Sequence, residues 1–167
     1  MKQSELDHIL NQHKLWLDSN GDQGKRANLT GANLTGANLD GANLTRAHLY
    51  GANLAGANLV DANLVDANLS GADLSGVNLT GANLDAANLV DAILTDANLR
   101  SANLTDANLS GADLTRANLV DANLIGSILN STYMNRAKVN QSQLSWLATD
   151  PNFCDWVDQL DVKKEAA

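Results

Sequence analysis

The sequence predicts an all-β solenoid whose coils each have four sides, and three observations lead to this prediction. Leu occupies every fifth position from Leu29 to Leu129, 21 times without exception. Ala stands two residues before each of these Leu, with Val77 and Ser127 as the only substitutes. The second residue after Leu is Gly in ten of the twenty units from Gly31 to Gly126, and Asp in six.

A period of five fits neither an ordinary helix nor a flat strand. On an α-helix, with about 100° of rotation per residue, successive Leu would spread around the axis and form no buried stripe. On a flat strand, an odd period would place each Leu on the opposite face from the last. The Ala and Leu of one unit can share a face in extended backbone, but the next unit matches them only if the chain turns between the two.

The residues after Leu favour such a turn. Gly, and to a lesser degree Asp, tolerates the positive φ that the third residue of a type II turn requires. One short side and one corner per five residues close into a square after four units. The sequence therefore predicts coils of about twenty residues, stacked at the strand spacing of roughly 4.8 Å into a rod roughly 25–30 Å long.

The repeated unit, seen as Ala27-Asn28-Leu29-Thr30-Gly31, resembles the pentapeptide-repeat family in its bacterial, cyanobacterial-like form, and the segment from His13 to Arg26 resembles the lead-in of many bacterial members. The resemblance covers Ala27 to about Val139. It implies a right-handed quadrilateral β-helix in which the Leu and Ala of each unit fill the interior. Asn precedes Leu in 16 of the 21 units. Residues twenty apart should stack, so we expect amide ladders along columns such as Asn38, Asn58, Asn78, Asn98 and Asn118.

The chain divides into three segments that we expect to form one cooperative domain: an N-terminal helical cap (1–26), the β-helix (27–142) and a C-terminal helical cap (143–167). In the first segment, Ser4 is a candidate N-cap with Asp7 three residues later, and Asn20-Gly21 is a candidate helix end. Apolar and aromatic residues at helical spacing predict the face that covers the first coil. These are Leu6, Ile9, Leu10, His13, Trp16 and Leu17.

The last segment predicts a second cap. Asp150-Pro151 has the sequence of an N-cap followed by the first helical residue. An apolar face then follows, which together with Trp146 would close the last coil; its residues are Phe153, Trp156, Val157 and Leu160. Cys154 is the only cysteine, so the chain contains no internal disulfide, and we interpret it as a small residue within this cap.

Charge and hydropathy narrow the functional classes. The formal net charge of −8 argues against direct binding to nucleic acid or to an anionic membrane surface. No apolar run approaches membrane-spanning length, which predicts no membrane insertion, and the N-terminus has no signal-peptide core. We therefore expect a soluble cytoplasmic protein, although a mature exported or lumenal form with its signal removed would show the same features.

No residue is a candidate for catalysis, for cofactor binding or for metal binding. The sequence contains no nucleophile–base pair at a suggestive spacing and no phosphate-binding Gly loop, and a Leu/Ala interior leaves no substrate cavity. His8 and His13 lack a third ligand, and we interpret His13 as a packing residue of the cap. The sequence thus predicts a protein that is not an enzyme and needs no cofactor.

Two functional hypotheses remain, both tied to the family resemblance. The first is a rigid protein-interaction or scaffold module that binds an unidentified protein partner, with weak homodimerisation as a further outcome. Arg46, His48 and Tyr50 break the repeat at what we take to be one corner and are a candidate contact patch. The alternative is a DNA-mimicking inhibitor of a type II topoisomerase such as gyrase. Asp40–Asp121 contains ten Asp and three Arg, but the Asp are divided among the sides with no dense stripe.

Overall fold

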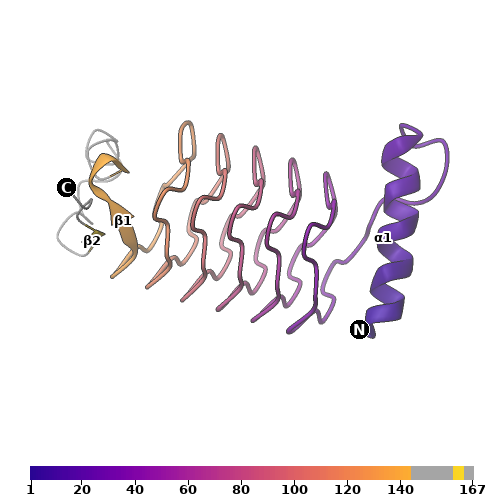
Figure 1. The fold of residues 1–167 in the computed structure, drawn as a ribbon, viewed down its shortest axis with the longest axis horizontal. Helices are drawn as coiled ribbons and strands as arrows, with labels where there is room; N and C mark the ends of the chain where they lie inside the picture. The colour runs from indigo at the N-terminus through magenta and orange to yellow at the C-terminus, as the bar shows by residue number, and fades with distance from the viewer. Residues whose placement is uncertain (144–159, 164–167) are drawn as a thin grey trace.

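The computed structural model describes residues 1–143 and 160–163 as a stack of coils with a helix across one end (Figure 1). The named elements are the helix α1 (Gln3–Asp18) and two short strands, β1 (Lys138–Asn140) and β2 (Asp161–Lys163). Between α1 and β1 the chain contains no strand longer than a single bridged residue. Each side of a coil instead contributes a single β-bridge, followed by a two-residue turn.

The bridges define the coil length. All of them are parallel and join residues twenty positions apart, from Asn28 with His48 through to Asn118 with Lys138. Two backbone hydrogen bonds flank each bridge: the Leu29 N–H donates to the His48 carbonyl at 2.7 Å, and the His48 N–H donates to the Ala27 carbonyl at 3.0 Å. The predicted coil of twenty residues with four bridge positions is therefore confirmed.

Each corner is a tight turn closed by one backbone hydrogen bond. In the first unit the Ala32 N–H donates to the Leu29 carbonyl at 3.0 Å, and Gly31 has a φ of 63°. The Gly and Asp at the equivalent position have positive φ, as predicted. Within the twenty units from Gly31 to Gly126, four other residues at this position do so as well, although a side chain in this region costs roughly 1–2 kcal/mol. These are Arg46, Ala86, Ser101 and Arg116, with φ between 53° and 60°.

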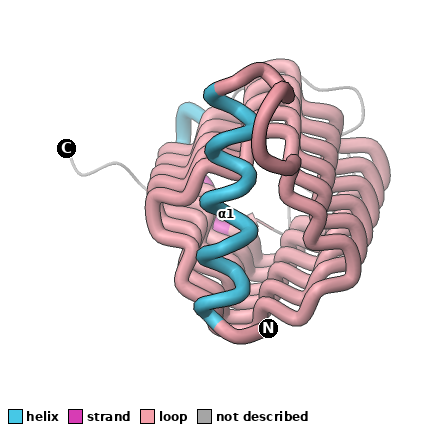
Figure 2. Tube along the Cα trace, turned by 90° about the vertical axis from the view of Figure 1, so that its right-hand side faces the viewer, coloured by secondary structure: helices cyan, strands magenta, loops and turns pink. Residues whose placement is uncertain are grey.

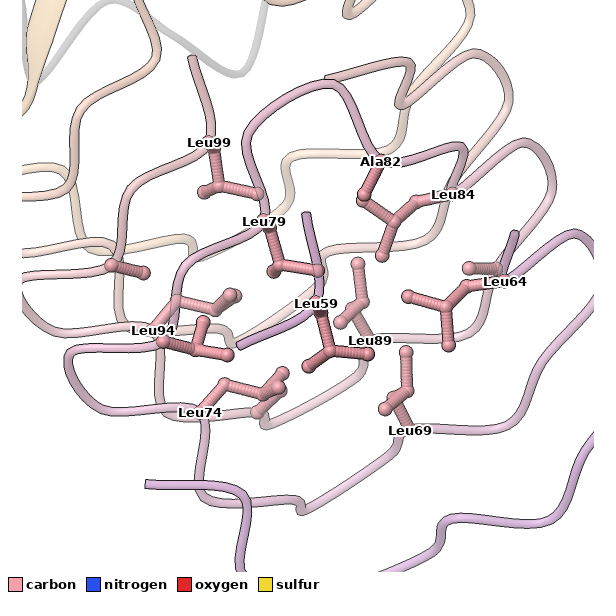
Figure 3. Packing of buried hydrophobic residues seen from close by; sticks show 14 of the residues in the cluster. Leu59, Leu64, Leu69, Leu74, Leu79, Ala82, Leu84, Leu89, Leu94 and Leu99 are labelled. Atoms are coloured by element: carbon pink, nitrogen blue, oxygen red, sulfur yellow. The ribbon is translucent and has the colours of Figure 1, made fainter. Parts of the chain in front are cut away.

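The interior is filled by the repeated Leu and their Ala partners. All 21 repeat Leu have exposed fractions between 0% and 4%, and Met134 and Val139 continue the series beyond them. Figure 3 shows that Leu59, Leu79 and Leu99 follow one another in successive coils and point into the same interior. The inside position predicted for Leu and Ala is confirmed, with Ala32, Ala37 and Ala42 of the first coil only partly buried.

The helix α1 lies across the open end of the first coil (Figure 2). All six residues of its predicted apolar face are buried or partly buried, and Leu6 and His13 are fully so. The helix ends as predicted, with positive φ at Asn20 and Gly21. The predicted N-cap is wrong, because the N-cap is Lys2 and not Ser4. The Glu5 carboxylate accepts the Lys2 N–H at 3.1 Å, which starts the helix two residues earlier.

The opposite end contains a feature that the sequence did not predict. Strand β2 pairs in parallel with β1, with Asp161 opposite Lys138, and the Asp161 N–H donates to the Ala137 carbonyl at 2.9 Å. This bond repeats the pattern between coils, so β2 extends one side of the solenoid by a further rung. Leu160, predicted on a helix face, instead directly precedes this strand. The other residues of the predicted C-terminal face, together with Trp146, Asp150, Pro151 and Cys154, lie outside the described residues.

A pair of lysine substitutions tests the assignment of inside and outside. Leu79 has an exposed fraction of 0%, so Leu79→Lys places a charge in an apolar core. We expect the free energy of unfolding to fall by at least about 4 kcal/mol. Ala86→Lys, at an exposed corner with positive φ, should change it by less than about 1 kcal/mol. Urea denaturation followed by circular dichroism measures both, and equal losses would contradict the assignment.

Candidate interaction surfaces

The solvent-facing residues of each unit are the residue before Leu and the two corner residues after it. Since Leu and Ala fill the interior, these outward positions carry the side chains that can contact another molecule. Many of them are already engaged in bonds between or within coils. The candidate site is therefore best described by separating residues that serve the fold from residues that do not.

The Asn side chains serve the fold. Each repeat Asn accepts a hydrogen bond from the backbone N–H two residues later, as when the Arg100 N–H donates to Asn98 Oδ1 at 3.3 Å. Several Asn also donate to the Asn of the preceding coil, as from Asn103 Nδ2 to Asn83 Oδ1 at 2.9 Å. The expected ladders are thus present along part of two columns. The bonded pairs are Asn38–Asn58, Asn78–Asn98, Asn98–Asn118, Asn83–Asn103 and Asn103–Asn123.

Three of the four Arg within residues 27–142 each pair with an Asp of a neighbouring coil. The Arg116–Asp96 pair is bidentate, with Nε to Oδ1 at 2.7 Å and an Nη to Oδ2 at 2.5 Å. The hydrogen bond from Arg116 is the main cause that lowers the pKa of Asp96 below its ordinary value. The other two pairs are looser, and they are Arg46–Asp66 at 3.6 Å and Arg100–Asp121 at 3.5 Å.

Sequence reasoning missed these ion pairs, although an Asp and an Arg about twenty residues apart were the available signal.

Three further Asp bend over a glycine in the next coil. A Cβ built on Gly81 would lie 2.3 Å from Oδ1 of Asp61, and similar values apply to Asp91 over Gly111 and Asp106 over Gly126. A glycine twenty residues after these Asp therefore provides room for the carboxylate. The acidic side chains are thus either paired with Arg, folded over glycine or separated on different sides, and they form no continuous acidic stripe.

The candidate contact patch of Arg46, His48 and Tyr50 covers a larger part of the coil than predicted. His48 occupies the bridge position in the middle of one side, whereas Arg46 and Tyr50 lie at the corners before and after it. The three residues therefore span a whole side and not one corner. Arg46 already makes two contacts within the protein, because its guanidinium pairs with Asp66 and its carbonyl accepts a hydrogen bond from Arg26 Nε. Tyr50 is the freest of the three, with an exposed fraction of 57%.

Shallow hollows occur at the two ends of the described solenoid. One of about 320 Å³ lies between α1 and the first coil, beside Leu10, Lys14 and Asn43. Another of about 230 Å³ lies beside Leu124, Ile125 and Gln143. Across residues 1–143 and 160–163, no three His, Cys, Asp or Glu side chains gather as they would around a metal ion. Within the same residues no helix combines the length and apolar character needed to cross a membrane.

The repeats match a known family model. Pentapeptide repeats, in eight copies, align with residues 27–64, 62–100, 92–130 and 102–141. The chain belongs to the pentapeptide-repeat family. The resemblance inferred from the Ala-Asn-Leu units is therefore confirmed, over nearly the same residues as predicted.

The chain is also similar to solved structures of other pentapeptide-repeat proteins. Rfr23 from the cyanobacterium Cyanothece 51142 is 29% identical with a TM-score of 0.50, covering 81% of this chain and 96% of Rfr23. HetL from Nostoc sp. strain PCC 7120, involved in regulating heterocyst differentiation, is 34% identical with a TM-score of 0.27, covering 68% and 60% of the two chains.

A thylakoid-lumen protein of Arabidopsis thaliana is 27% identical with a TM-score of 0.37, covering 74% of this pentapeptide-repeat protein and 75% of the plant chain. A comparison with curated proteins found no match.

The Arg116–Asp96 pair leads to a prediction about one carboxyl group. Replacing Arg116 with Ala removes the main cause of the shift, so the pKa of Asp96 should rise towards its ordinary value. Carboxyl carbon chemical shifts in an NMR titration measure this change. Arg136→Ala is the matched control, since Arg136 occupies the same corner position one coil later and should leave the pKa of Asp96 unchanged. An equal effect of both variants would contradict the ion pair.

Proposed function

We propose that this pentapeptide-repeat protein is a rigid, non-catalytic interaction module that binds another protein through its outward sides. The observation that carries the proposal is the filled interior, in which every repeat Leu is buried and each coil is hydrogen-bonded to the next. Such a structure offers a fixed array of outward side chains, and the Leu and Ala of the described coils fill the interior space that a substrate would need. We also propose that the coil is a right-handed quadrilateral β-helix, that the chain folds as a single cooperative domain, and that the protein is located in the cytoplasm.

The side that contains His48 is the first candidate for the contact. Tyr50 supports this choice, because a tyrosine presents a large ring together with a hydroxyl group and is enriched in protein interfaces. The ion pair between Arg46 and Asp66 is solvent-exposed, so it costs little to rearrange when a partner binds. We expect neither nucleic acid nor a membrane as the partner, since the net charge is −8.

Imitation of DNA in an inhibitor of gyrase has less support. A duplex presents one negative charge per roughly 1.7 Å in a regular array. Here Asp66, Asp96 and Asp121 are paired with Arg, and the remaining Asp of the repeat are spread over the sides of the coil. This distribution favours a role of the Asp in turns and in contacts between coils.

Site-specific photo-crosslinking tests the interaction module. A photoreactive amino acid at Tyr50 should form a crosslink to one protein in cells of the source organism. The same substitution at Arg100 is the matched control, because Arg100 occupies the equivalent corner position two sides away. Excess wild-type protein should compete for the Tyr50 crosslink, and the Tyr50→Ala variant should compete several-fold less well. Absence of any competed crosslink, when positions on all four sides are tested, would argue against the module.

A supercoiling assay separates the two functions. If the protein is an interaction module for another partner, purified gyrase should supercoil plasmid DNA at an unchanged rate even with the protein in large molar excess. The acidic side chains then have only their structural role. Inhibition at a stoichiometric ratio would instead favour DNA mimicry, and would direct attention to the sides that contain unpaired Asp.

A further inference from the structure

One ionisable side chain is buried where three parts of the molecule meet. His13 has an exposed fraction of 0% and lies where α1, the 19–26 connection and the first coil come together. Its Nδ1 atom accepts a hydrogen bond from the backbone N–H of Ala27 at 3.1 Å. Ala27 is the first residue of the repeat, so this bond ties the helix directly to the start of the solenoid.

The hydrogen bond defines the protonation state of the ring. Because Ala27 donates, Nδ1 must carry a lone pair, and the imidazole is neutral with its hydrogen on Nε2. The ring stacks on Trp16, with 5.6 Å between the ring centroids and 12° between the planes. The Arg26 guanidinium lies 5.7 Å from the centre of the same Trp16 ring. A cation therefore already occupies the neighbourhood of His13.

The surroundings disfavour a charged imidazole. Burial is the main cause that lowers the pKa of His13 below its ordinary value, and Arg26 lowers it further. The Thr45 backbone carbonyl raises the pKa of His13, but the contact with Nε2 does not reach the geometry of a full hydrogen bond. Of the other charged groups on these elements, Lys14 on α1 pairs with Asp18 and Arg46 at the adjacent corner pairs with Asp66, while Asp22 and Lys25 of the 19–26 connection are not among the causes of the shift of His13. No carboxylate among the described residues contributes to the shift of His13.

We propose that the N-terminal cap is a pH-sensitive closure, in which protonation of His13 releases α1 from the first coil. A proton on Nδ1 would point at the Ala27 N–H, so a hydrogen bond would be replaced by two opposed donors. The new charge would also lie beside Arg26 in a site without water access. Release of α1 exposes the interior of the first coil, including Leu29 and Leu44.

The effect should be confined to the cap. The buried polar residues of the described chain are His13, Ser127 and Thr132, and of these only His13 titrates in water near neutral pH. Leu6 is the only other fully buried residue of α1. Close to the helix start, Gln3 Nε2 donates to the Asn38 carbonyl at 3.3 Å from an exposed position. The helix is therefore held by one apolar face and a small set of hydrogen bonds, including one from the Met1 amino group to the Asn33 carbonyl at 2.8 Å, whereas the coils behind it share a continuous apolar core.

The direction of the pH dependence follows from the lowered pKa. Released His13 should titrate near its ordinary pKa of about 6.5, whereas docked His13 titrates below it. As the pH falls below about 6.5, the released state binds more protons than the docked state. The equilibrium constant for release should then rise by about tenfold per pH unit, until the docked ring also titrates.

Hydrogen exchange of the full chain measures this release. In the wild-type protein, amide protection factors in α1 should fall by about tenfold per pH unit below pH 6.5, whereas those of the central coils should stay constant. His13→Gln keeps an acceptor for the Ala27 N–H but cannot be protonated, so it should remove the pH dependence. His8→Gln is the matched control, because His8 is exposed on the same helix and its loss should leave the wild-type behaviour intact.

Two results would overturn the closure. One is protection in wild-type α1 that does not change between pH 7.5 and pH 5. The other is a His13→Gln variant whose α1 remains as pH-dependent as that of the wild type. If the variant does not dock its helix at neutral pH, the imidazole resonances of wild-type His13 decide. If the His13 resonances titrate over the same pH range in which the Trp16 indole signal changes, the closure is supported. If His13 titrates at its ordinary pKa without a change at Trp16, the closure is contradicted.

Discussion

The whole molecule depends on the hydrogen bonds and core contacts that each coil makes with the next. A single coil fixes twenty residues, at a cost of roughly 1–2 kcal/mol each, and contains four Leu that contribute only roughly 2 kcal/mol apiece when buried. It cannot be stable alone. In the stack, each bridge is flanked by two hydrogen bonds to the neighbouring coil, and Leu meets Leu above and below. Stability is therefore shared between neighbours, as in other repeat proteins.

This constraint explains why the corners accept unfavourable residues. Arg46 and Ala86 adopt the left-handed backbone that glycine prefers, because the coils before and after them already specify the turn. The same stacking determines how the outward side chains are used. Asn bonds to Asn, Asp96 bonds to Arg116, and the carboxylate of Asp61 lies over Gly81. Residues twenty positions apart thus act as neighbours, and relatively few outward side chains remain for a partner.

The two ends close the core by different means. At the N-terminal end, α1 lays an apolar face across the coil and joins it through the buried His13. At the other end, β2 adds a rung in register with β1. Hydrogen bonds and apolar contacts both extend the solenoid there, with Leu160 and Val162 packed against the core. The described contacts at the two ends therefore differ in kind, with a buried imidazole at one end and backbone hydrogen bonds at the other.

The sequence by itself determined the repeat, because a period of five with Leu, Ala and Gly allows few backbone solutions. The core, the corner positions and the coil length follow from that local pattern, and the apolar face of α1 follows from the helical spacing of its residues. The tertiary structure decided the features that depend on partners distant in sequence. The pairing of Asp161 with Lys138 breaks the spacing of twenty, and the Arg–Asp pairs depend on side-chain reach across coils. The burial of His13 against Ala27 likewise depends on how α1 docks on the first coil. Local periodicity specifies a coil, whereas docking specifies how that coil ends.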